Sequence, residues 1–117
     1  MSPVKRISVN RKAFYEYDIL ERLEAGMVLT GTEIKSVRAS RVSLQEAFAR
    51  TDKGAIWLFN AHIAYYPQGG IYNHDPTRPR KLLLHRSEIT RLTSLLGQRG
   101  LTLVPLSLYI KNHLAKV

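Results

Sequence analysis

The sequence predicts a mainly β fold, a small barrel that carries short helices. Several segments alternate apolar and polar residues with the period of half-buried strands. Helix-capping residues open short stretches between these segments. The 117 residues are enough for one domain with its own core, and no linker or internal repeat divides the chain. We therefore expect residues 1–117 to form a single domain.

Three short helices are expected. The first covers one or two turns over 11–17, after an asparagine that is a suitable N-cap. Thr30 and Glu33 have the three-residue spacing of a capping box, so a second helix should begin there. A third helix follows Ser87, and its apolar stripe consists of Ile89, Leu92, Leu95 and Leu96.

The expected strands are 17–23, a hairpin formed by 42–51 and 55–64, and 101–110. Asp52-Lys53-Gly54 suits the hairpin turn because its glycine tolerates a positive φ. Pro105 indicates an edge or a bulge in the last strand. We expect Phe48, Trp57 and Phe59 in the core. Because closing such a sheet removes exposed edges, the predicted class is a closed or partly open oligonucleotide-binding-type (OB-like) barrel with about three flanking helices.

Charge is the clearest feature of the composition. Lysine and arginine outnumber aspartate and glutamate by 18 to 9, a net charge of +9. Such a field favours polyanions, and nucleic acid is the default partner. A membrane surface ranks behind, because no basic amphipathic helix with a bulky apolar face stands out. No run approaches the roughly 20 apolar residues of a membrane span, and the polar N-terminus does not resemble a signal peptide. We expect a cytoplasmic protein.

Neither a metal site nor catalytic machinery is indicated. There is no cysteine, and the four histidines lack the spacing of metal ligands. A nucleophile elbow, a Walker loop and a dinucleotide fingerprint are all missing. The chain is therefore not expected to be an enzyme or to hold a cofactor. A small ribonuclease that uses His85 with a lysine remains an alternative.

Asp75–Arg86 is the most informative segment. Its two prolines stiffen the backbone, and the run Leu82-Leu83-Leu84 should anchor it to a core. The residues then available for phosphate or base contacts are Arg78, Arg80, Lys81, His85 and Arg86. The alternative is an ordinary solvated loop. If the segment binds RNA, reversing the charge of Arg80 should flatten the salt dependence of binding.

Further basic and aromatic residues support the same interpretation. Asn10-Arg11-Lys12 heads a predicted helix, where side chains and free N–H groups can both meet phosphate. Lys35, Arg38 and Arg41 form a basic ridge. Unpaired bases could stack on Tyr15, Tyr65, Tyr66 and Tyr72. Each feature alone is often a solvated face or a core position, and together they favour a nucleic-acid-binding module.

Four stretches, in order along the chain, then form a specific pattern. They are NRKA at 10–13, EAGMVLTGTEIKSVR at 24–38, DPTRPRKLLLH at 75–85, and VPLSLY at 104–109 followed by Lys111-Asn112. With these motifs the chain resembles the SsrA-binding protein family, also called small protein B. Members of that family are partners of transfer-messenger RNA in bacterial ribosome rescue.

The resemblance implies an OB-type barrel without enzymatic activity that binds the tRNA-like domain of transfer-messenger RNA, around its D-loop and elbow. It implies a monomer that helps this RNA become aminoacylated and delivers it to the decoding region of stalled ribosomes. Elongation factor Tu and alanyl-tRNA synthetase would be indirect partners, associated through the RNA. Family contacts fall on positions matching Glu24, Leu83 and His85. Chemistry extends the expected RNA-binding set to Asn10, Arg11, Lys12, Lys35, Ser36, Arg38, Arg41, Arg78, Arg80, Lys81 and Arg86.

Three points qualify the resemblance. Phe14 and Tyr15 stand where relatives commonly carry Arg-His. The family continues past the position of Val117 through a last strand and a basic tail, so we expect a truncated form that binds the RNA without supporting tagging. A ribosomal or general single-strand RNA-binding OB-type protein remains the runner-up interpretation.

Overall fold

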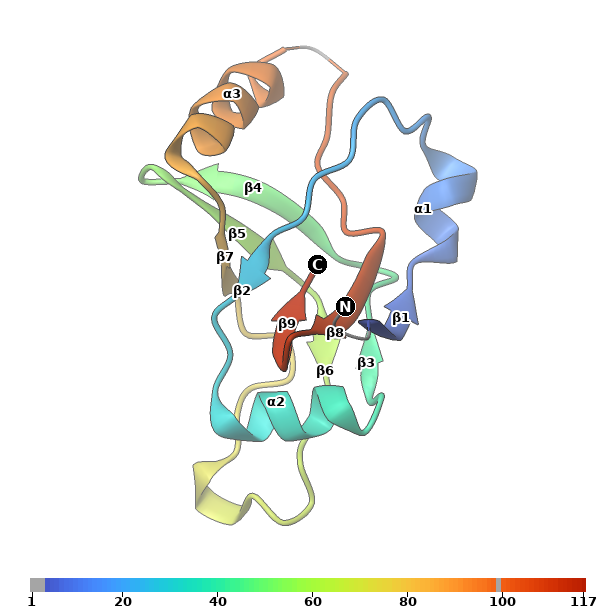
Figure 1. Ribbon diagram of the computed structural model, residues 1–117, viewed down its shortest axis with the longest axis vertical. Coiled ribbons are helices and arrows are strands. Elements are labelled where there is room, and N and C mark those ends of the chain that lie inside the picture. Colours follow the sequence, from blue (N-terminus) through green and yellow to red (C-terminus); the bar gives the residue numbers. More distant parts are fainter. Residues whose placement is uncertain (1–3, 99) are drawn as a thin grey trace.

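A computed structural model describes residues 4–98 and 100–117. Over these residues, seven strands form one antiparallel sheet in the order β1-β8-β9-β2-β7-β5-β4, and β3 pairs with β6 separately. The strands are β1 Val4–Val9, β2 Gly26–Met27, β3 Val42–Ser43, β4 Phe48–Asp52, β5 Ala55–Phe59, β6 His62–Ile63, β7 Arg80–Leu83, β8 Ser107–Lys111 and β9 Leu114–Lys116. In Figure 1 the large sheet curves around a core, with helices at both ends and at one side.

The sheet is a partly open OB-like barrel. Its edge strands β1 and β4 pair with one neighbour each and, over the described residues, not with each other. The predicted fold class is therefore confirmed in its open form. Part of the remaining gap is bridged by Ala49, whose N–H donates to the Leu103 carbonyl at 2.9 Å.

The three predicted helices are present: α1 Arg11–Glu16, α2 Gly31–Arg38 and α3 Arg86–Leu96, with a 3-10 helix η1 at Gly70–Tyr72. Asn10 caps α1 as expected, because its side chain accepts from the Ala13 N–H. The capping box at α2 is also confirmed. The third helix begins two residues earlier than predicted, with His85 rather than Ser87 as its N-cap.

The predicted hairpin exists but is shorter than expected. β4 and β5 join through Lys53 and Gly54, which both have positive φ (51° and 78°), the backbone that a two-residue hairpin turn needs. A turn closed by the Ala47 N–H on the Leu44 carbonyl interrupts the first arm. The outer parts of both arms consequently form the separate β3–β6 pair.

The predicted strand at 17–23 was wrong, because Tyr17–Ala25 has no regular secondary structure. Its alternation reflects packing: Ile19 and Leu23 line an apolar cleft while the residues between them face solvent. An alternating pattern makes a strand only where a neighbouring strand offers its backbone. Only at the end of the segment does Ala25 exchange backbone bonds, of 2.8 and 2.9 Å, with Val117.

The predicted strand at 101–110 was too long at its start. Pro105 is buried and lacks an N–H, and regular pairing begins only at β8. The sequence analysis did not anticipate β9, which pairs with both β8 and β2. Asn112 and His113 make its turn at positive φ (52° and 64°), a conformation that asparagine tolerates well.

The core lies on the concave face of the sheet. Its fully buried members include Val37 of α2 and the strand residues Ile56, Leu58 and Leu108. The core placement of Phe48, Trp57 and Phe59 was wrong, because all three are half-buried on the opposite face of β4 and β5. There the rings of Phe48 and Phe59 stack with centroids 5.5 Å apart, and the Arg50 guanidinium lies 4.5 Å from the Phe59 centroid.

Candidate nucleic-acid interface

The best candidate interface begins on β7. Along this strand buried and exposed residues alternate, so Leu82 points into the core while Lys81 and Leu83 face solvent. Leu83 is 53% exposed although it is a large apolar side chain. The anchoring roles predicted for Leu82 and Leu84 are confirmed, since Leu82 belongs to the core and Leu84 packs against it.

Two of the sequence stretches described above, 24–38 and 75–85, meet at this strand. Gly26 of β2 pairs with Leu83, and a Cβ on Gly26 would lie only 3.3 Å from the Leu83 Cβ. Glu24 precedes Gly26 by two residues and His85 follows Leu83 by two, so both side chains belong to the same end of this strand pair. We call the exposed set Glu24, Lys81, Leu83, His85 and Arg86 the β2–β7 surface.

Glu24 is the acidic member of the β2–β7 surface. The Tyr109 hydroxyl donates to its carboxylate, and the Lys111 ammonium lies 3.7 Å away. The hydrogen bond from Tyr109 holds the pKa of Glu24 below its usual range; burial opposes this shift, and the nearby Lys111 and Lys116 add to it. Burial and the same hydrogen bond raise the pKa of Tyr109 to about 12. Glu24 is therefore an ionised acceptor, suited to base amino groups or 2′-hydroxyls.

A shallow groove of about 290 Å³ adjoins Leu83. Its exposed apolar walls are Val28, Leu83 and Leu114, with His113 at one side. The sequence analysis missed this apolar neighbourhood, because Leu114 reaches Leu83 only through the unexpected strand β9. The Asn112-His113 turn was the signal that could have revealed it.

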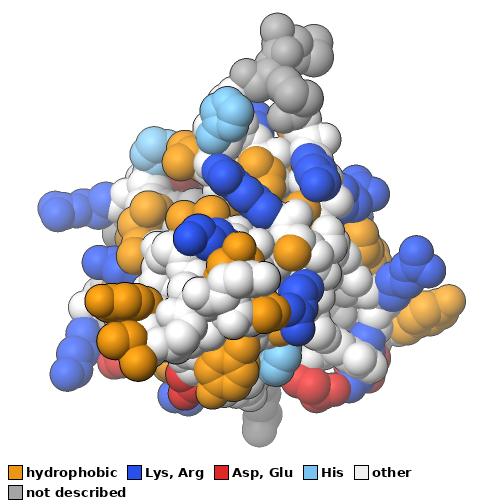
Figure 2. Space-filling view, turned by 90° about the horizontal axis from the view of Figure 1, so that it is seen from below, with side chains coloured by type: hydrophobic (Ala, Val, Ile, Leu, Met, Phe, Trp, Pro, Cys, Tyr) orange, Lys and Arg blue, Asp and Glu red, His pale blue; other side chains and the backbone are white. Residues whose placement is uncertain are grey.

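The basic ridge is present along α2. Lys35, Arg38 and Arg41 are all exposed, and the Lys35 ammonium lies 5.4 Å from the centroid of the Tyr66 ring. Figure 2 looks onto this end of the molecule and shows blue lysine and arginine side chains spread among orange apolar groups, with few red acidic ones.

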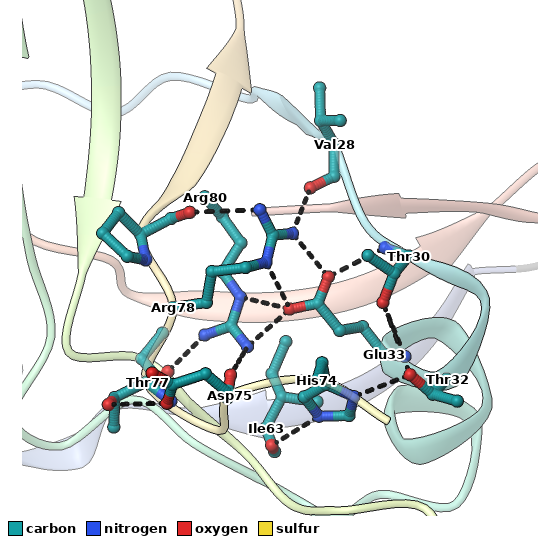
Figure 3. A network of polar contacts seen from close by, with 12 residues as sticks. Val28, Thr30, Thr32, Glu33, Ile63, His74, Asp75, Thr77, Arg78 and Arg80 are labelled. Atoms are coloured by element: carbon teal, nitrogen blue, oxygen red, sulfur yellow. Dashed lines mark hydrogen bonds and ion pairs between the residues drawn. The ribbon is translucent and has the colours of Figure 1, made fainter. Parts of the chain in front are cut away.

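Arg78 and Arg80 do not extend this exposed surface, because Glu33 holds them. Arg80 is fully buried; its Nε donates to Glu33 Oε2 at 2.7 Å and its NH1 to the Ala61 carbonyl at 2.6 Å. Arg78 is about one third exposed, and its NH2 lies 2.6 Å from Glu33 Oε1. Figure 3 shows both guanidinium groups converging on this one carboxylate. Burial leaves Arg80 no access to a phosphate.

Glu33 is the centre of this network. Burial alone would raise the pKa of this carboxyl, but hydrogen bonds from Arg78, the Thr30 N–H and Arg80 lower it to about 2. Glu33 was predicted only as part of a helix cap. Its partners lie 45 and 47 residues further along the chain, so no local sequence pattern reveals them.

Two other predicted contact residues are also interior. Asn10 donates from Nδ2 to the carbonyls of Leu44 (3.1 Å) and Pro105 (2.9 Å), which ties α1 to the barrel. Ser36 is fully buried in α2, and its hydroxyl has no hydrogen-bond partner among the described residues. Neither side chain is accessible to RNA in this structure.

The α1 cations lie apart from the β2–β7 surface. Arg11 is exposed, whereas Lys12 pairs with Glu46 at 3.2 Å and more loosely with Glu16. In Figure 1 α1 is at one side of the barrel and β7 at the other. The structure thus divides the predicted residues between the β2–β7 surface, the α2 ridge, α1 and the interior.

Within residues 4–98 and 100–117, no cluster of three or more His, Cys, Asp or Glu side chains could hold a metal ion. In the same part of the chain, no helix is both long enough and apolar enough to cross a membrane.

An open OB-like barrel with an exposed basic and apolar face defines the chain as a nucleic-acid-binding type of domain. Comparison with known families is more specific. The SmpB protein family matches residues 7–117. The chain belongs to this family, which confirms the resemblance found in its sequence.

Individual relatives support the assignment to this family. The chain is 57% identical over 111 residues to the SsrA-binding protein of Ligilactobacillus salivarius (strain UCC118), covering 95% of this chain and 72% of that protein. It is 54% identical over 113 residues to the SsrA-binding protein of Carboxydothermus hydrogenoformans, covering 97% and 76%. A solved structure described as "tmRNA-SmpB: a journey to the center of the bacterial ribosome" matches with a TM-score of 0.72 and 44% identity, over 99% of this chain and 78% of that one.

Proposed function

We propose that this protein binds the tRNA-like domain of transfer-messenger RNA, around the D-loop and elbow, and acts with that RNA on ribosomes in trans-translation. Family membership supports the proposal, as does the solved relative whose description names tmRNA and the ribosome. The observation that carries it is local. Two long family motifs, 24–38 and 75–85, converge on the β2–β7 surface, where Leu83 is exposed beside Gly26.

The chemistry of the β2–β7 surface suits folded RNA. Lys81 supplies a mobile charge for phosphate, and Leu83 offers an apolar contact to a base or ribose. His85 and Arg86 stand at the N-terminus of α3, where the helix dipole also favours an anion. Glu24 accepts hydrogen bonds only, so it favours base amino groups and 2′-hydroxyls and disfavours a misplaced phosphate.

In this proposal the protein is a binding partner rather than a catalyst. It acts as a monomer in the bacterial cytoplasm, promotes aminoacylation by alanyl-tRNA synthetase through the RNA, and travels to the decoding region with elongation factor Tu. The two exposed basic regions, the β2–β7 surface and the α2 ridge, allow contact with more than one RNA segment.

Gel shifts at one stated salt concentration test the proposal. The tRNA-like domain should bind more tightly than ordinary tRNA or unstructured RNA. Leu83→Ala should weaken binding about tenfold, the scale expected for removing one partly buried leucine. Leu20→Ala is the matched control, because this leucine is 79% exposed and lies outside the β2–β7 surface, and it should bind like the unmodified chain. Equal affinity for all three RNAs would favour the runner-up, a general single-strand RNA-binding protein.

The salt dependence of RNA affinity distinguishes a charged contact from an apolar contact on the β2–β7 surface. Lys81→Ala should lower the slope of log affinity against log salt by about 0.7–0.9, the loss expected for one phosphate contact, whereas Leu83→Ala should leave the slope unchanged. Arg80 is unsuitable for this test. Because its guanidinium is buried on Glu33, the charge reversal predicted to flatten the slope would instead unfold the barrel.

A further inference from the structure

The segment between β6 and β7 ends in an exposed apolar tip. It projects beyond α2 at one end of the long axis of the molecule (Figure 1). Ile71 is 91% exposed, Tyr72 81% and Tyr65 57%. We call these three residues the loop tip. Two large apolar side chains with nearly complete exposure, side by side in η1, are unusual on a protein surface unless a partner covers them.

The loop tip is held rigidly. Asn73 closes the loop, because its Oδ1 accepts from the Tyr66 N–H at 3.1 Å and its Nδ2 donates to the Tyr66 carbonyl at 2.7 Å. The buried ring of His74 then bridges Thr32 Oγ1 at 2.8 Å and the Ile63 carbonyl at 2.9 Å (Figure 3). The tip is thus fixed to both α2 and β6.

Two glycines make this turn possible. Gly70 has a φ of +56°, and a Cβ on Gly69 would lie 2.8 Å from Asn73 Nδ2 and 3.0 Å from Thr32 Cγ2. A loop that only linked two strands would not need so tight an arrangement around exposed apolar residues. A preorganised loop loses less conformational entropy when it binds, which favours a binding role.

The charges around the loop tip indicate an anionic partner. Lys35 lies over Tyr66 at the base of the loop; Arg38 follows on the same helix, and Arg41 lies three residues beyond its end. The nearest acid along the chain, Asp75, accepts from the Thr77 N–H and hydroxyl. Aromatic and apolar groups bordered by cations match the base faces and phosphates of unpaired RNA.

We propose that the loop tip is a second RNA contact, on which an unpaired base stacks against Tyr72 while Lys35 meets a neighbouring phosphate. It lies on the far side of α2 from the β2–β7 surface, so both sites can be occupied together. This inference rests on the proposed function and adds a site to it. The unpaired base can belong to transfer-messenger RNA or to ribosomal RNA, which offer the same chemistry.

Tyr72→Ala is the main test, with two matched variants. Tyr72→Phe retains the ring, and Leu20→Ala removes an apolar side chain of the 17–25 segment that is 79% exposed but lies away from the loop tip. Each variant is titrated at one salt concentration against the tRNA-like domain in one arm, and against purified small ribosomal subunits and their protein-free RNA in the other. Both substituted positions are exposed, and circular dichroism checks the fold.

Tyr72→Ala should weaken binding roughly 5- to 100-fold in at least one arm, which corresponds to one stacked base. Tyr72→Phe and Leu20→Ala should bind like the unmodified chain. Unchanged affinity of Tyr72→Ala in both arms would overturn the proposal. A loss seen with intact subunits but not with their protein-free RNA would also overturn it, in favour of a protein partner. If the unmodified chain binds ribosomal RNA but not the tRNA-like domain, the proposed function fails while the loop-tip contact stands.

Discussion

The two ends of this barrel are held together by different forces. At the α2 end, buried polar groups satisfy one another: Glu33 joins two arginines and the start of α2, and His74 joins α2 to β6. At the α3 end, 17–25 and 100–106 cross the barrel without regular structure around an apolar cleft of about 970 Å³. Figure 1 shows these segments as long connections beside α1 and α3.

The polar end fixes the geometry of the fold, whereas the apolar end contributes contacts without a fixed geometry. The polar network has directional bonds and fixes one position for the loop tip and for the start of β7. The cleft is lined by aliphatic residues such as Leu82, Leu92 and Leu103, whose contacts tolerate sliding and give no such fixed geometry. Both proposed RNA sites therefore depend on the polar end. Three substitutions and one pH titration test this contrast through the free energy of unfolding.

Glu33→Gln should have the largest effect. It removes the carboxylate charge and leaves the buried Arg80 and the half-buried Arg78 without their anion. Breaking a buried pair in this way costs about 3–5 kcal/mol, a drop in melting temperature of roughly 10–20 °C. Urea titration measures it. Glu46→Gln, which breaks an exposed pair with Lys12, is the control and should leave the urea midpoint within error. A similar small effect of Glu33→Gln would mean that the network does not hold the α2 end.

Acid should weaken the same network by about 3 kcal/mol. Since the folded state lowers the pKa of Glu33 from 4.5 to about 2, the stabilisation is complete above pH 4.5 and is lost as the pH falls towards 2. Urea midpoints measured between pH 5 and pH 2 should therefore fall, and Glu33→Gln should remove that part of the dependence. Parallel pH curves for the two proteins would contradict this assignment.

Thr32→Val should cost about 1–3 kcal/mol, because it keeps the shape but leaves the His74 ring nitrogen buried without its partner. Thr90→Val is the matched control on α3. The Thr90 hydroxyl is exposed and bonds only to the Arg86 carbonyl, so its loss should change stability by less than about 0.5 kcal/mol. Equal effects of the two substitutions would show that the His74 bridge is dispensable.

Leu95→Ala at the α3 end should have the smallest effect, about 1 kcal/mol. Leu95 lines the open cleft and is only half-buried, so water replaces it and no closed cavity remains. Leu108→Ala in the closed part of the core should cost about 2–5 kcal/mol in the same assay. A cost at Leu95 as large as that at Leu108 would show that the cleft is tightly packed in solution.

The parts of this structure that the sequence predicts well depend on neighbouring residues. The capping box of Thr30 and Glu33 is decided within four residues, and the hairpin turn at Lys53-Gly54 by two. The alternation of Leu82 and Leu83, which separates an anchor from a binding residue, is likewise visible along one strand. Short-range sterics and periodicity determine these features.

The sequence predictions were wrong where partners distant in sequence determine whether a side chain is buried. Arg80 has the sequence context of a phosphate ligand, yet Glu33 and the Ala61 carbonyl draw it inside. The sequence predicts an accessible Asn10 at the start of a helix. In the structure its side chain is buried, where it donates to the carbonyls of Leu44 and Pro105. Desolvation by residues 19 to 95 positions away in sequence is a tertiary effect, and a local sequence pattern does not reveal it.

The position of Glu33 also affects the order in which the chain assembles during synthesis. Its carboxylate precedes Arg80 by 47 residues, so α2 leaves the ribosome long before either guanidinium exists. Until then Glu33 is a hydrated helix cap, and the start of β7 has no anchor. The α2 end therefore closes late, when Glu33 and Arg80 are buried together. A nascent chain halted before Arg80 would contain α1 and α2 but would lack β7, and with it the β2–β7 surface.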